Sequence, residues 1–275
     1  MKQLFYFIIG LFVLNACTTD SSGKIVKKDK EQKSNEIDAD KAVIDKLKLD
    51  DGLVVYWFEK GNGEQLKDGD LVEIDYKVKL KDGTVVDGNH LLKRKTLPFL
   101  LGFNLQTKGW DIALRELRVG DYVKVLIPSK LARGDKGIEG LIPPNADNLL
   151  FIKIVSLIKP NRSVDGTNVW LLEENKDNKL KFNDKNRIQF HAMASTPSTS
   201  TFVNTFRSNQ PFSFKLSDHG LVPGLTKALI NAKKFDRMYI VVPSKEAYGK
   251  AGYLDIVKPD EPVFYNVLVM DVTKN

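Results

Sequence analysis

The amino-acid sequence predicts an α+β protein with two tandem domains, each a curved antiparallel β-sheet wrapped over one short α-helix. Two observations lead to this prediction. A pattern of residues occurs twice along the 275-residue chain, and each copy combines strand-like alternation with a single short helical stretch. The domains are expected at residues 51–160 and 163–275, and each is then of ordinary size for one domain.

The duplication is visible in segments that return at a nearly constant distance. The Asp-Gly pair at 51–52 returns at 165–166 after 114 residues, and the segment at 128–134 returns at 243–249 after 115 residues. Five of the seven positions in the longer segment are identical between the copies. Chance similarity of two β-rich stretches is the alternative, but the steady offset favours a duplicated domain.

Alternation with a period of two predicts the strands. Residues 72–80 alternate between apolar and mostly charged side chains, which is typical of a strand with one buried face. The Asp-Gly pair at 82–83 predicts a turn, and residues 84–86 return along the first strand. Further strands are predicted at 123–127 and 149–158. The latter is apolar on both faces, so a central place in the sheet is expected.

One helix is predicted in each copy. After Gly109, residues 110–117 have apolar side chains at i, i+3, i+4 and i+7, and Gly120 is the expected stop. The same spacing follows Gly224 in the second copy. A further short helix is predicted at 37–49, which either rests on the first domain or pairs with a second chain.

The first residues predict export. Lys2 precedes an uncharged apolar run at 4–14, which is too short to span a membrane and has the length of a signal-peptide core. The run ends at Cys17, the only cysteine, in a segment that resembles the lipobox of bacterial lipoproteins. A signal peptide at 1–16 and a lipidated Cys17 are therefore expected, although a secreted protein with a stray cysteine is the alternative.

Residues 17–50 are expected to form the lipidated cysteine and a charged tether. Thr18 stands where an aspartate would favour retention at the inner membrane in the enterobacterial sorting rule. This residue indicates the outer membrane, with the domains facing the periplasm, inside a bacterial cell envelope. The anchored protein would then contact the membrane only through its acyl chains.

Composition excludes several classes of protein. Apolar residues make up 42% and charged residues 28%, which is typical of packed domains. A single cysteine excludes an intramolecular disulfide and a thiolate zinc cluster, and three scattered histidines argue against a metal site. The net charge of +7 is spread over the chain, so a nucleic-acid partner is not expected. No cofactor is predicted.

A set of short segments, in order, is similar to the landmarks of the FKBP-type peptidyl-prolyl isomerases. The resemblance is close over 51–159 and looser over 165–275. The segments are 70–76 (Asp-Leu-Val-Glu-Ile-Asp-Tyr), 82–87 (Asp-Gly-Thr-Val-Val-Asp), 98–99 (Pro-Phe), 109–111 (Gly-Trp-Asp), 141–146 (Leu-Ile-Pro-Pro-Asn-Ala) and Phe151.

This resemblance implies a shallow apolar pocket that receives a proline ring. It implies that Trp110 forms the floor, that Tyr76 and Phe151 form aromatic walls together with Phe99 or Leu97, and that Asp87 lies beside the twisting amide. The remaining positions that the resemblance assigns to the pocket are Ile142, whose backbone would hold the peptide, and the substrate-contacting Val86, Thr107 and Arg133.

The implied activity is rotation about X–Pro bonds in unfolded, proline-containing polypeptides, to assist the folding of exported proteins. The alternative is a lipoprotein without catalysis that binds polypeptides or braces an envelope complex. Two departures favour this alternative: Arg133 stands where the family often has tyrosine, and Gln106-Thr107 replace a pair of aliphatic residues.

The second copy departs further from the family pattern. Leu225 stands at the tryptophan position, and the tyrosine position falls on Ala192 or, with a one-residue slip, on His191. Asn204 is expected at the aspartate position. A degenerate second domain, weak or inactive as an isomerase, is therefore predicted.

Overall fold

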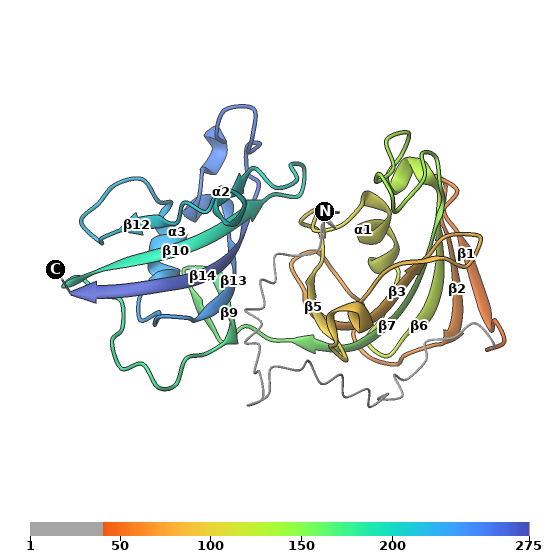
Figure 1. Ribbon diagram of the computed structural model, residues 1–275, viewed down its shortest axis with the longest axis horizontal. Coiled ribbons are helices and arrows are strands. Elements are labelled where there is room, and N and C mark those ends of the chain that lie inside the picture. The colour runs from red at the N-terminus through yellow and green to blue at the C-terminus, as the bar shows by residue number, and fades with distance from the viewer. Residues whose placement is uncertain (1–40, 275) are drawn as a thin grey trace, which may run out of the picture.

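The computed structural model describes residues 41–274, and these form two bodies that lie side by side (Figure 1). The first body contains one seven-stranded antiparallel sheet, and the second contains another. The chain passes from one body to the other through the short connection between β7 (Asn148–Ile158) and β8 (Arg162–Val164). The α+β class predicted from the sequence is therefore confirmed.

In the first body the sheet order is β1-β2-β6-β7-β3-β4, and β5 pairs with β3. The apolar strand β7 is central, as its sequence predicts. The elements of this body are β1 (Asp45–Lys48), β2 (Val54–Glu59), β3 (Leu71–Lys79), β4 (Val85–Gly88), β5 (Leu97–Leu100), α1 (Lys108–Leu114) and β6 (Tyr122–Ile127), with 3-10 turns at Asn89–Leu92 and Ser129–Leu131.

The second body repeats this plan, with the order β11-β10-β14-β13-β9-β8 and β12 paired with β10. Its helix α3 (Pro223–Leu229) lies over the sheet as α1 does in the first. The other elements are β9 (Thr167–Glu173), β10 (Asn186–Ser195), β11 (Val203–Asn204), α2 (Thr205–Ser208), β12 (Phe212–Phe214), β13 (Arg237–Val242) and β14 (Val263–Lys274), with 3-10 turns at Ser244–Glu246 and Gly249–Ala251.

Two expectations about helices need correction. The part of the predicted 37–49 helix that the structure describes contains the edge strand β1, which pairs with β2 from Asp45 opposite Trp57 to Lys48 opposite Val54. The helix α1 ends at Leu114, six residues before the expected stop at Gly120. Leu117 is still buried, because the chain after α1 continues in a turn that keeps this side chain in the core.

Glycine sets the distance between each helix and its sheet. A Cβ at Gly109 would lie 2.3 Å from Ile127 Cγ2, and one at Gly224 would lie 2.4 Å from Val242 Cγ1. Such contacts are not tolerated, so only glycine lets the first turn of the helix approach the strand this closely. The residue that follows each glycine is thereby pressed against the concave face of the sheet.

The two bodies meet through a buried apolar interface that the sequence does not predict. Leu71, Leu100 and Phe103 of the first body pack with Trp170, Tyr239 and Phe264, which lie on the outer face of the second sheet. All six side chains are at most 2% exposed. The interface therefore resembles a small core rather than a loose contact between independent domains.

Polar contacts surround this interface. Ser195 Oγ donates to the carbonyl of Phe103 at 2.7 Å, and Trp170 Nε1 donates to the carbonyl of Ile158 at 2.8 Å. Asn104 Nδ2 donates to the carbonyl of Thr196 at 3.0 Å. These bonds satisfy groups that the contact removes from water, and they fix the loop at 101–107 against the second body.

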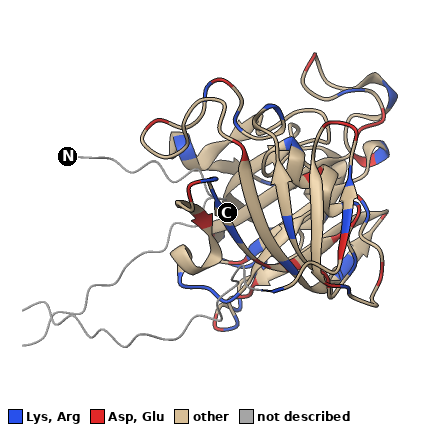
Figure 2. Cartoon of the chain, turned by 90° about the vertical axis from the view of Figure 1, so that its right-hand side faces the viewer, with Lys and Arg blue, Asp and Glu red and all other residues tan. Residues whose placement is uncertain are grey.

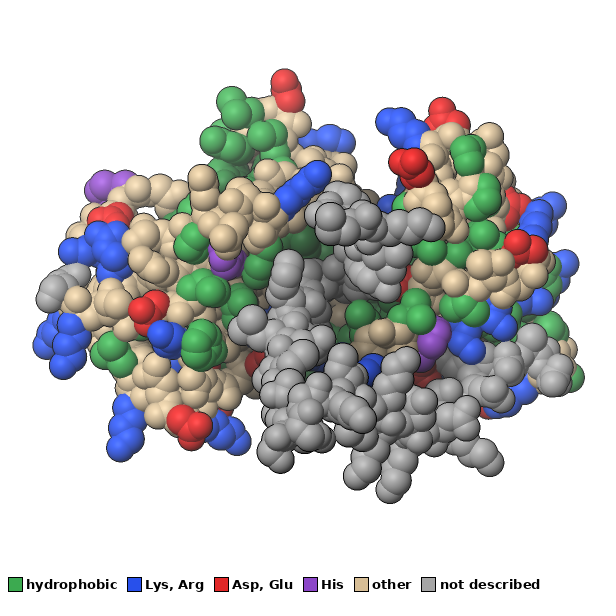
Figure 3. Space-filling model, in the orientation of Figure 1, with side chains coloured by type: hydrophobic (Ala, Val, Ile, Leu, Met, Phe, Trp, Pro, Cys, Tyr) green, Lys and Arg blue, Asp and Glu red, His purple; other side chains and the backbone are tan. Residues whose placement is uncertain are grey.

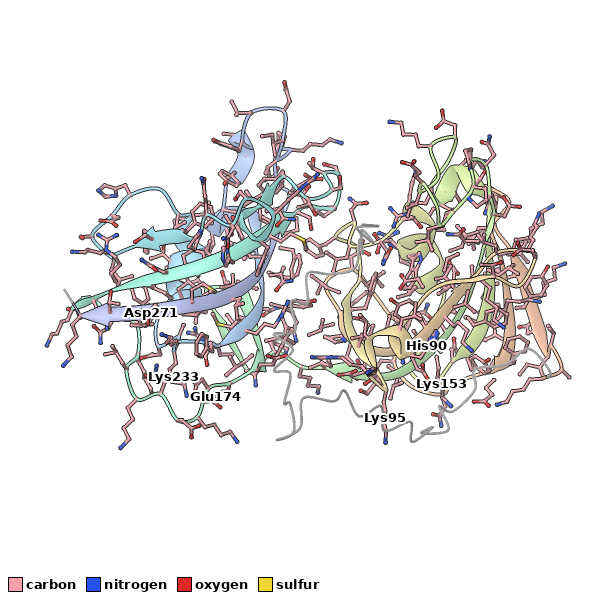
Figure 4. All side chains as sticks on the ribbon, viewed as in Figure 1. His90, Lys95, Lys153, Glu174, Lys233 and Asp271 are labelled. Carbon is pink, nitrogen blue, oxygen red and sulfur yellow. The ribbon has the colours of Figure 1, made fainter. Side chains whose placement is uncertain are left out.

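Charge is mixed over the described surface. Figure 2 shows basic and acidic residues interspersed on the face of the first body. Some of them form ion pairs, such as Lys233 with Glu174 at 2.7 Å in the second body, where the two labelled side chains lie close together (Figure 4). No single-sign stripe is visible on the face in Figure 2.

Candidate active site

A small, shallow hollow opens in the first body between α1 and the strands β3 and β5. Apolar and aromatic side chains provide most of its wall. The lining residues are Ile74, Tyr76, Leu97, Pro98, Phe99, Gln106 and Trp110. The hollow is open to the surface on one side, so the indole of Trp110 borders accessible space although its side chain is 97% covered by neighbours.

Three aromatic rings form the floor and walls. The Trp110 ring meets the Tyr76 ring edge-on, with centroids 5.1 Å apart and an interplanar angle of 78°. It meets the Phe99 ring at 5.4 Å and 32°. In the edge-to-face pair of Tyr76 and Trp110, the positive edge of one ring faces the negative face of the other, which favours this orientation. The predicted grouping of Tyr76, Phe99 and Trp110 is thus present in the structure.

A carboxyl group lies beside this aromatic wall. The hydroxyl of Tyr76 donates to Asp87 Oδ1 at 3.1 Å, and the backbone amide of Gly88 donates to the same oxygen at 2.7 Å. Burial raises the pKa of Asp87 above its ordinary value, an effect that these bonds and the positive charge of Arg133 oppose. Burial also raises the pKa of Tyr76, so its hydroxyl stays protonated and remains a donor.

Arg133 reaches the rim of the hollow from the loop after β6. Its Nη2 lies 3.4 Å from Gln106 Oε1, and Asp87 is the carboxylate whose charge acts on it. Burial lowers the pKa of this guanidinium, yet an arginine remains charged under all physiological conditions. Arg133 and Gln106 therefore place polar groups at one edge of an otherwise apolar site.

Other predicted site residues lie close to the hollow without lining it. Val86 and Ile142 are buried in the same core cluster as Trp110. Thr107 occupies the cap position before α1 and is 8% exposed, but its side chain makes no capping bond. Within residues 41–274 its hydroxyl has no hydrogen-bond partner, which is uncommon for a buried polar atom.

The expectation that Phe151 forms a wall of the hollow is wrong. Alternate residues of β7 point to opposite faces of the sheet, and Leu150 and Ile152 point into the core. Phe151 points to the other face, where it packs with Phe58 and Tyr122. Leu150 therefore takes the place that the sequence comparison gave to Phe151, one residue away.

The second body can be aligned with the first through two hydrogen bonds that occupy equivalent places in the two sheets. The amide of Tyr76 donates to the side chain of Asn89 at 2.7 Å, and the amide of Ala192 donates to Thr205 Oγ1 at 2.8 Å. This alignment selects Ala192 rather than His191 as the counterpart of Tyr76.

The alignment also corrects an expectation about the acidic position. Counting back from Asn89 and Thr205, the counterpart of Asp87 is Val203, whereas Asn204 caps α2 by accepting from the amide of Arg207. The equivalent pairs around the hollow are Tyr76 with Ala192, Val86 with Phe202, Asp87 with Val203, Gln106 with Leu221, Thr107 with Val222, Trp110 with Leu225, Arg133 with Tyr248, and Leu150 with Tyr265.

The loop of the second body that corresponds to 133–142 is more apolar. Leu254 is 77% exposed and Tyr253 is 45% exposed, and the Tyr253 ring stacks on Tyr248 at 4.9 Å. In Figure 3 the hydrophobic side chains gather on this loop at the top of the second body. The equivalent of Leu254 in the first body is Glu139, so the two loops share a backbone path but differ in chemistry.

The fold consists of two antiparallel sheets, each with one helix over it, and one sheet borders an aromatic hollow beside a partly buried carboxyl group. These features define a tandem-domain protein with a site suited to a small apolar ring. Comparison with known families agrees with this class. The family model described as FKBP-type peptidyl-prolyl cis-trans isomerase matches this chain twice, at residues 62–155 and 178–270. These matches cover more than half of the chain, and the chain belongs to this family.

Individual relatives are more distant. The chain is 24% identical to human peptidyl-prolyl cis-trans isomerase FKBP10 over 218 residues, which cover 79% of the chain but 37% of that protein. It is 34% identical over 116 residues to the FKBP-type isomerase FkpA of Escherichia coli strain K12, covering 42% of the chain and 40% of FkpA. The chain thus spans well under two thirds of these relatives.

Among solved structures, the three FKBP domains of wheat FKBP73 match with a TM-score of 0.40 and 23% identity, covering 82% of this chain and 97% of the other. FkpA from Escherichia coli matches with a TM-score of 0.36 and 27% identity, covering 41% of this chain and 51% of the other.

Proposed function

We propose that the first domain catalyses rotation about X–Pro bonds in unfolded polypeptides, with the proline ring seated in the aromatic hollow. The observation that supports this most directly is the position of Trp110, whose indole borders an open hollow and is held by Tyr76 and Phe99. A rigid aromatic floor supplies apolar contact to a pyrrolidine ring without requiring the protein to rearrange.

The reaction needs no nucleophile or metal. The barrier to rotation about the peptide bond is about 18–20 kcal/mol, because the planar amide is stabilised by resonance. The twisted amide has lost that resonance and is less charge-separated. A hollow that is poor in water therefore favours the twisted state over the planar one, which is catalysis by differential binding.

The named side chains have separate roles in this proposal. Trp110, Tyr76 and Phe99 hold the ring, and Leu150 replaces Phe151 behind it. Asp87, oriented by the Tyr76 hydroxyl, lies beside the amide that rotates. Ile142 holds the peptide through its backbone, and Val86, Thr107 and Arg133 contact the flanking residues.

The second domain is proposed to contribute little or no isomerisation. It lacks the indole, the phenol and the carboxyl group at the three positions just named, where it has Leu225, Ala192 and Val203. It retains apolar side chains around the same place and presents Tyr253 and Leu254 to solvent. A role in binding an unfolded chain fits this composition better than catalysis does.

The cellular setting rests on the N-terminal sequence. Cys17 and the predicted signal peptide lie outside the described residues, and within residues 41–274 no helix is long and apolar enough to span a bilayer. We propose an anchor on a lipidated Cys17, at the outer membrane and facing the periplasm, where the domains assist the folding of exported proteins.

The test is an isomerisation assay on the chain from Thr18 onward, with a peptide that contains a single proline. Acceleration above the uncatalysed rate, abolished in Trp110→Ala while the far-ultraviolet spectrum is kept, supports the proposal. Acceleration of equal size in Trp110→Ala, or none in the parent chain, refutes it.

A protein that binds polypeptides without catalysis, or braces an envelope complex, is the second candidate. The narrowness of the hollow around Trp110, which leaves the indole 3% exposed, favours it. The same assay separates the two, because a binder would retain peptide affinity with no acceleration.

A further inference from the structure

The rim of the hollow differs in polarity between the two domains of this one chain. At three equivalent positions the first domain has polar residues where the second has aliphatic ones, and at a fourth it has a cation where the second has a phenol. The pairs are Asp87 with Val203, Gln106 with Leu221, Thr107 with Val222 and Arg133 with Tyr248. Both domains share the same sheet plan, so the difference in polarity belongs to the residues around the hollow and not to the fold.

Arg133 is the cation in this set. Its side chain is partly buried at the rim, and the one side-chain hydrogen bond that it makes to the described residues, to Gln106 Oε1, is long at 3.4 Å. Within residues 41–274 no carboxylate lies within 4.0 Å of the guanidinium. Asp87 acts on it from a greater distance, while its own Oδ1 is engaged by Tyr76 and Gly88.

A partly buried guanidinium with spare donors is a strong binding group for a carboxylate. Arginine offers five N–H donors in a planar fork, which matches the two oxygens of an acidic side chain. The unpartnered hydroxyl of Thr107, next to Gln106, is a further polar group at the start of α1. The other charges on the Arg133 loop, Asp135, Lys136 and Glu139, are exposed and screened by water.

We infer that Arg133 is a specificity-determining residue that selects prolines flanked by an acidic side chain. This inference rests on the proposed function, because it takes the hollow as the seat of the proline. A ring in the hollow places the neighbouring residues at the rim, where Arg133 lies. The acidic side chain then accepts hydrogen bonds from the guanidinium and replaces its weak contact with Gln106.

The test uses the full chain in detergent and four peptides, with Glu or Gln either directly before or directly after one proline. Isomerisation gives kcat/KM, and calorimetric titration gives affinity independently of turnover. At low salt we expect at least one Glu peptide to exceed its Gln partner by about five-fold in both measurements. Raising the salt to 0.5 M should reduce this ratio, because the contact is between charges.

Variants assign the effect to Arg133. Arg133→Gln and Arg133→Tyr, the latter copying the second domain, should bring the Glu:Gln ratio to about one, and Arg133→Lys should keep part of it. Lys136→Gln removes an exposed charge from the same loop and should leave the ratio unchanged. The inference is overturned if the parent chain gives a Glu:Gln ratio of one for every peptide pair. It is also overturned if Arg133→Gln keeps the ratio of the parent chain.

Failure of the proposed function gives a different result. If no peptide is isomerised but titration still favours Glu through Arg133, the site binds acidic proline peptides without catalysis, and the inference stands while the proposed activity falls. If isomerisation is present and the Glu:Gln ratio is one, the activity stands and the inference falls.

Discussion

Trp110 and Leu225 occupy the same position in the two copies of the fold. Each follows a glycine that lets its helix approach a strand, and each is nearly fully buried at 3% and 2% exposure. The first lines a hollow with Tyr76 and Phe99 as neighbours, whereas the tyrosine position of the second copy is Ala192. The second copy therefore shows that this backbone accepts leucine at the position of Trp110, which makes Trp110→Leu a suitable test variant.

Trp110→Leu should lower kcat/KM for a proline peptide by at least about tenfold while the fold persists. The variant removes much of the apolar floor, and burial of apolar area is worth about 25 cal/mol per Å². A coupled isomerisation assay measures the effect, and circular dichroism checks the fold.

Trp57→Phe is the matched control for that substitution. Trp57 is a second buried indole of the same domain, whose Nε1 donates to Asp121 Oδ2 at 3.0 Å, outside the hollow. Loss of this bond should lower stability by about 1 kcal/mol and leave turnover nearly unchanged. Equal losses of turnover in both variants would mean that the assay reports folding and not the site.

Asp87→Asn should stabilise the protein increasingly as the pH rises from 3 to 7. Burial raises the pKa of Asp87 in the folded state above its ordinary 3.8, so the fold favours the protonated carboxyl. Its favourable contribution is complete below the unfolded pKa and is lost as the pH rises through the folded pKa. The asparagine variant stays neutral and avoids that loss. Urea unfolding at several pH values measures the difference.

The same variant should isomerise proline peptides more slowly, because the carboxylate beside the amide is gone. Greater stability with lower activity is typical of a group kept for function. Asp121→Asn is the control: this carboxylate accepts from Trp57 Nε1 and from the amides of Gly61 and Arg118, so its loss should destabilise the fold at pH 7. Asp87→Asn with unchanged activity would remove Asp87 from the mechanism.

Phe151→Leu should lower stability by about 1 kcal/mol and leave isomerisation within about twofold of the parent. Phe151 packs with Phe58 and Tyr122 on the face of the sheet opposite the hollow, so it has no route to the substrate. Chemical unfolding and the peptide assay measure the two effects. A large fall in turnover without a fall in stability would mean that Phe151 contributes to the substrate site.

The sequence predicted the features that depend on local spacing. The alternation in β3, the apolar run of β7 and the glycine before each helix all act over a few residues, and the structure has them as expected. The aromatic group around Trp110 was implied by the resemblance of the ordered segments to the FKBP-type isomerases, and not by local spacing.

The wrong predictions about site residues came from the register of the strands, that is, from which residues of a strand face the core. A strand has a period of two, so a shift of one residue moves a side chain to the other face of the sheet. This shift explains why Leu150, not Phe151, faces the core, and why Val203, not Asn204, is the counterpart of Asp87. The error about β1 has another cause. Its partner β2 follows directly along the chain, and the pairing of Lys48 with Val54 across the turn overrides the local helical spacing.

The interface between the domains could not be predicted from the sequence, because the pattern around Phe103 does not indicate which residues bury it.

Phe103→Ala tests whether the contact between the two domains contributes to stability. Phe103 is 2% exposed, its ring lies 6.1 Å from that of Phe264, and its carbonyl accepts from Ser195 Oγ. Truncation of a buried phenylalanine costs about 3–5 kcal/mol, and here the cost falls on the contact that joins the two bodies.

The expected result is that a single calorimetric unfolding transition in the parent chain separates into two in Phe103→Ala, one for each domain, because the domains no longer stabilise each other. Phe235→Ala is the matched control, since Phe235 belongs to the second body and is 54% exposed. It should leave the transition single. If Phe103→Ala behaves like Phe235→Ala, the contact contributes no coupling. If it separates the transitions while Trp110-dependent turnover is kept, the docking stabilises the pair of domains, and catalysis depends on the first domain alone.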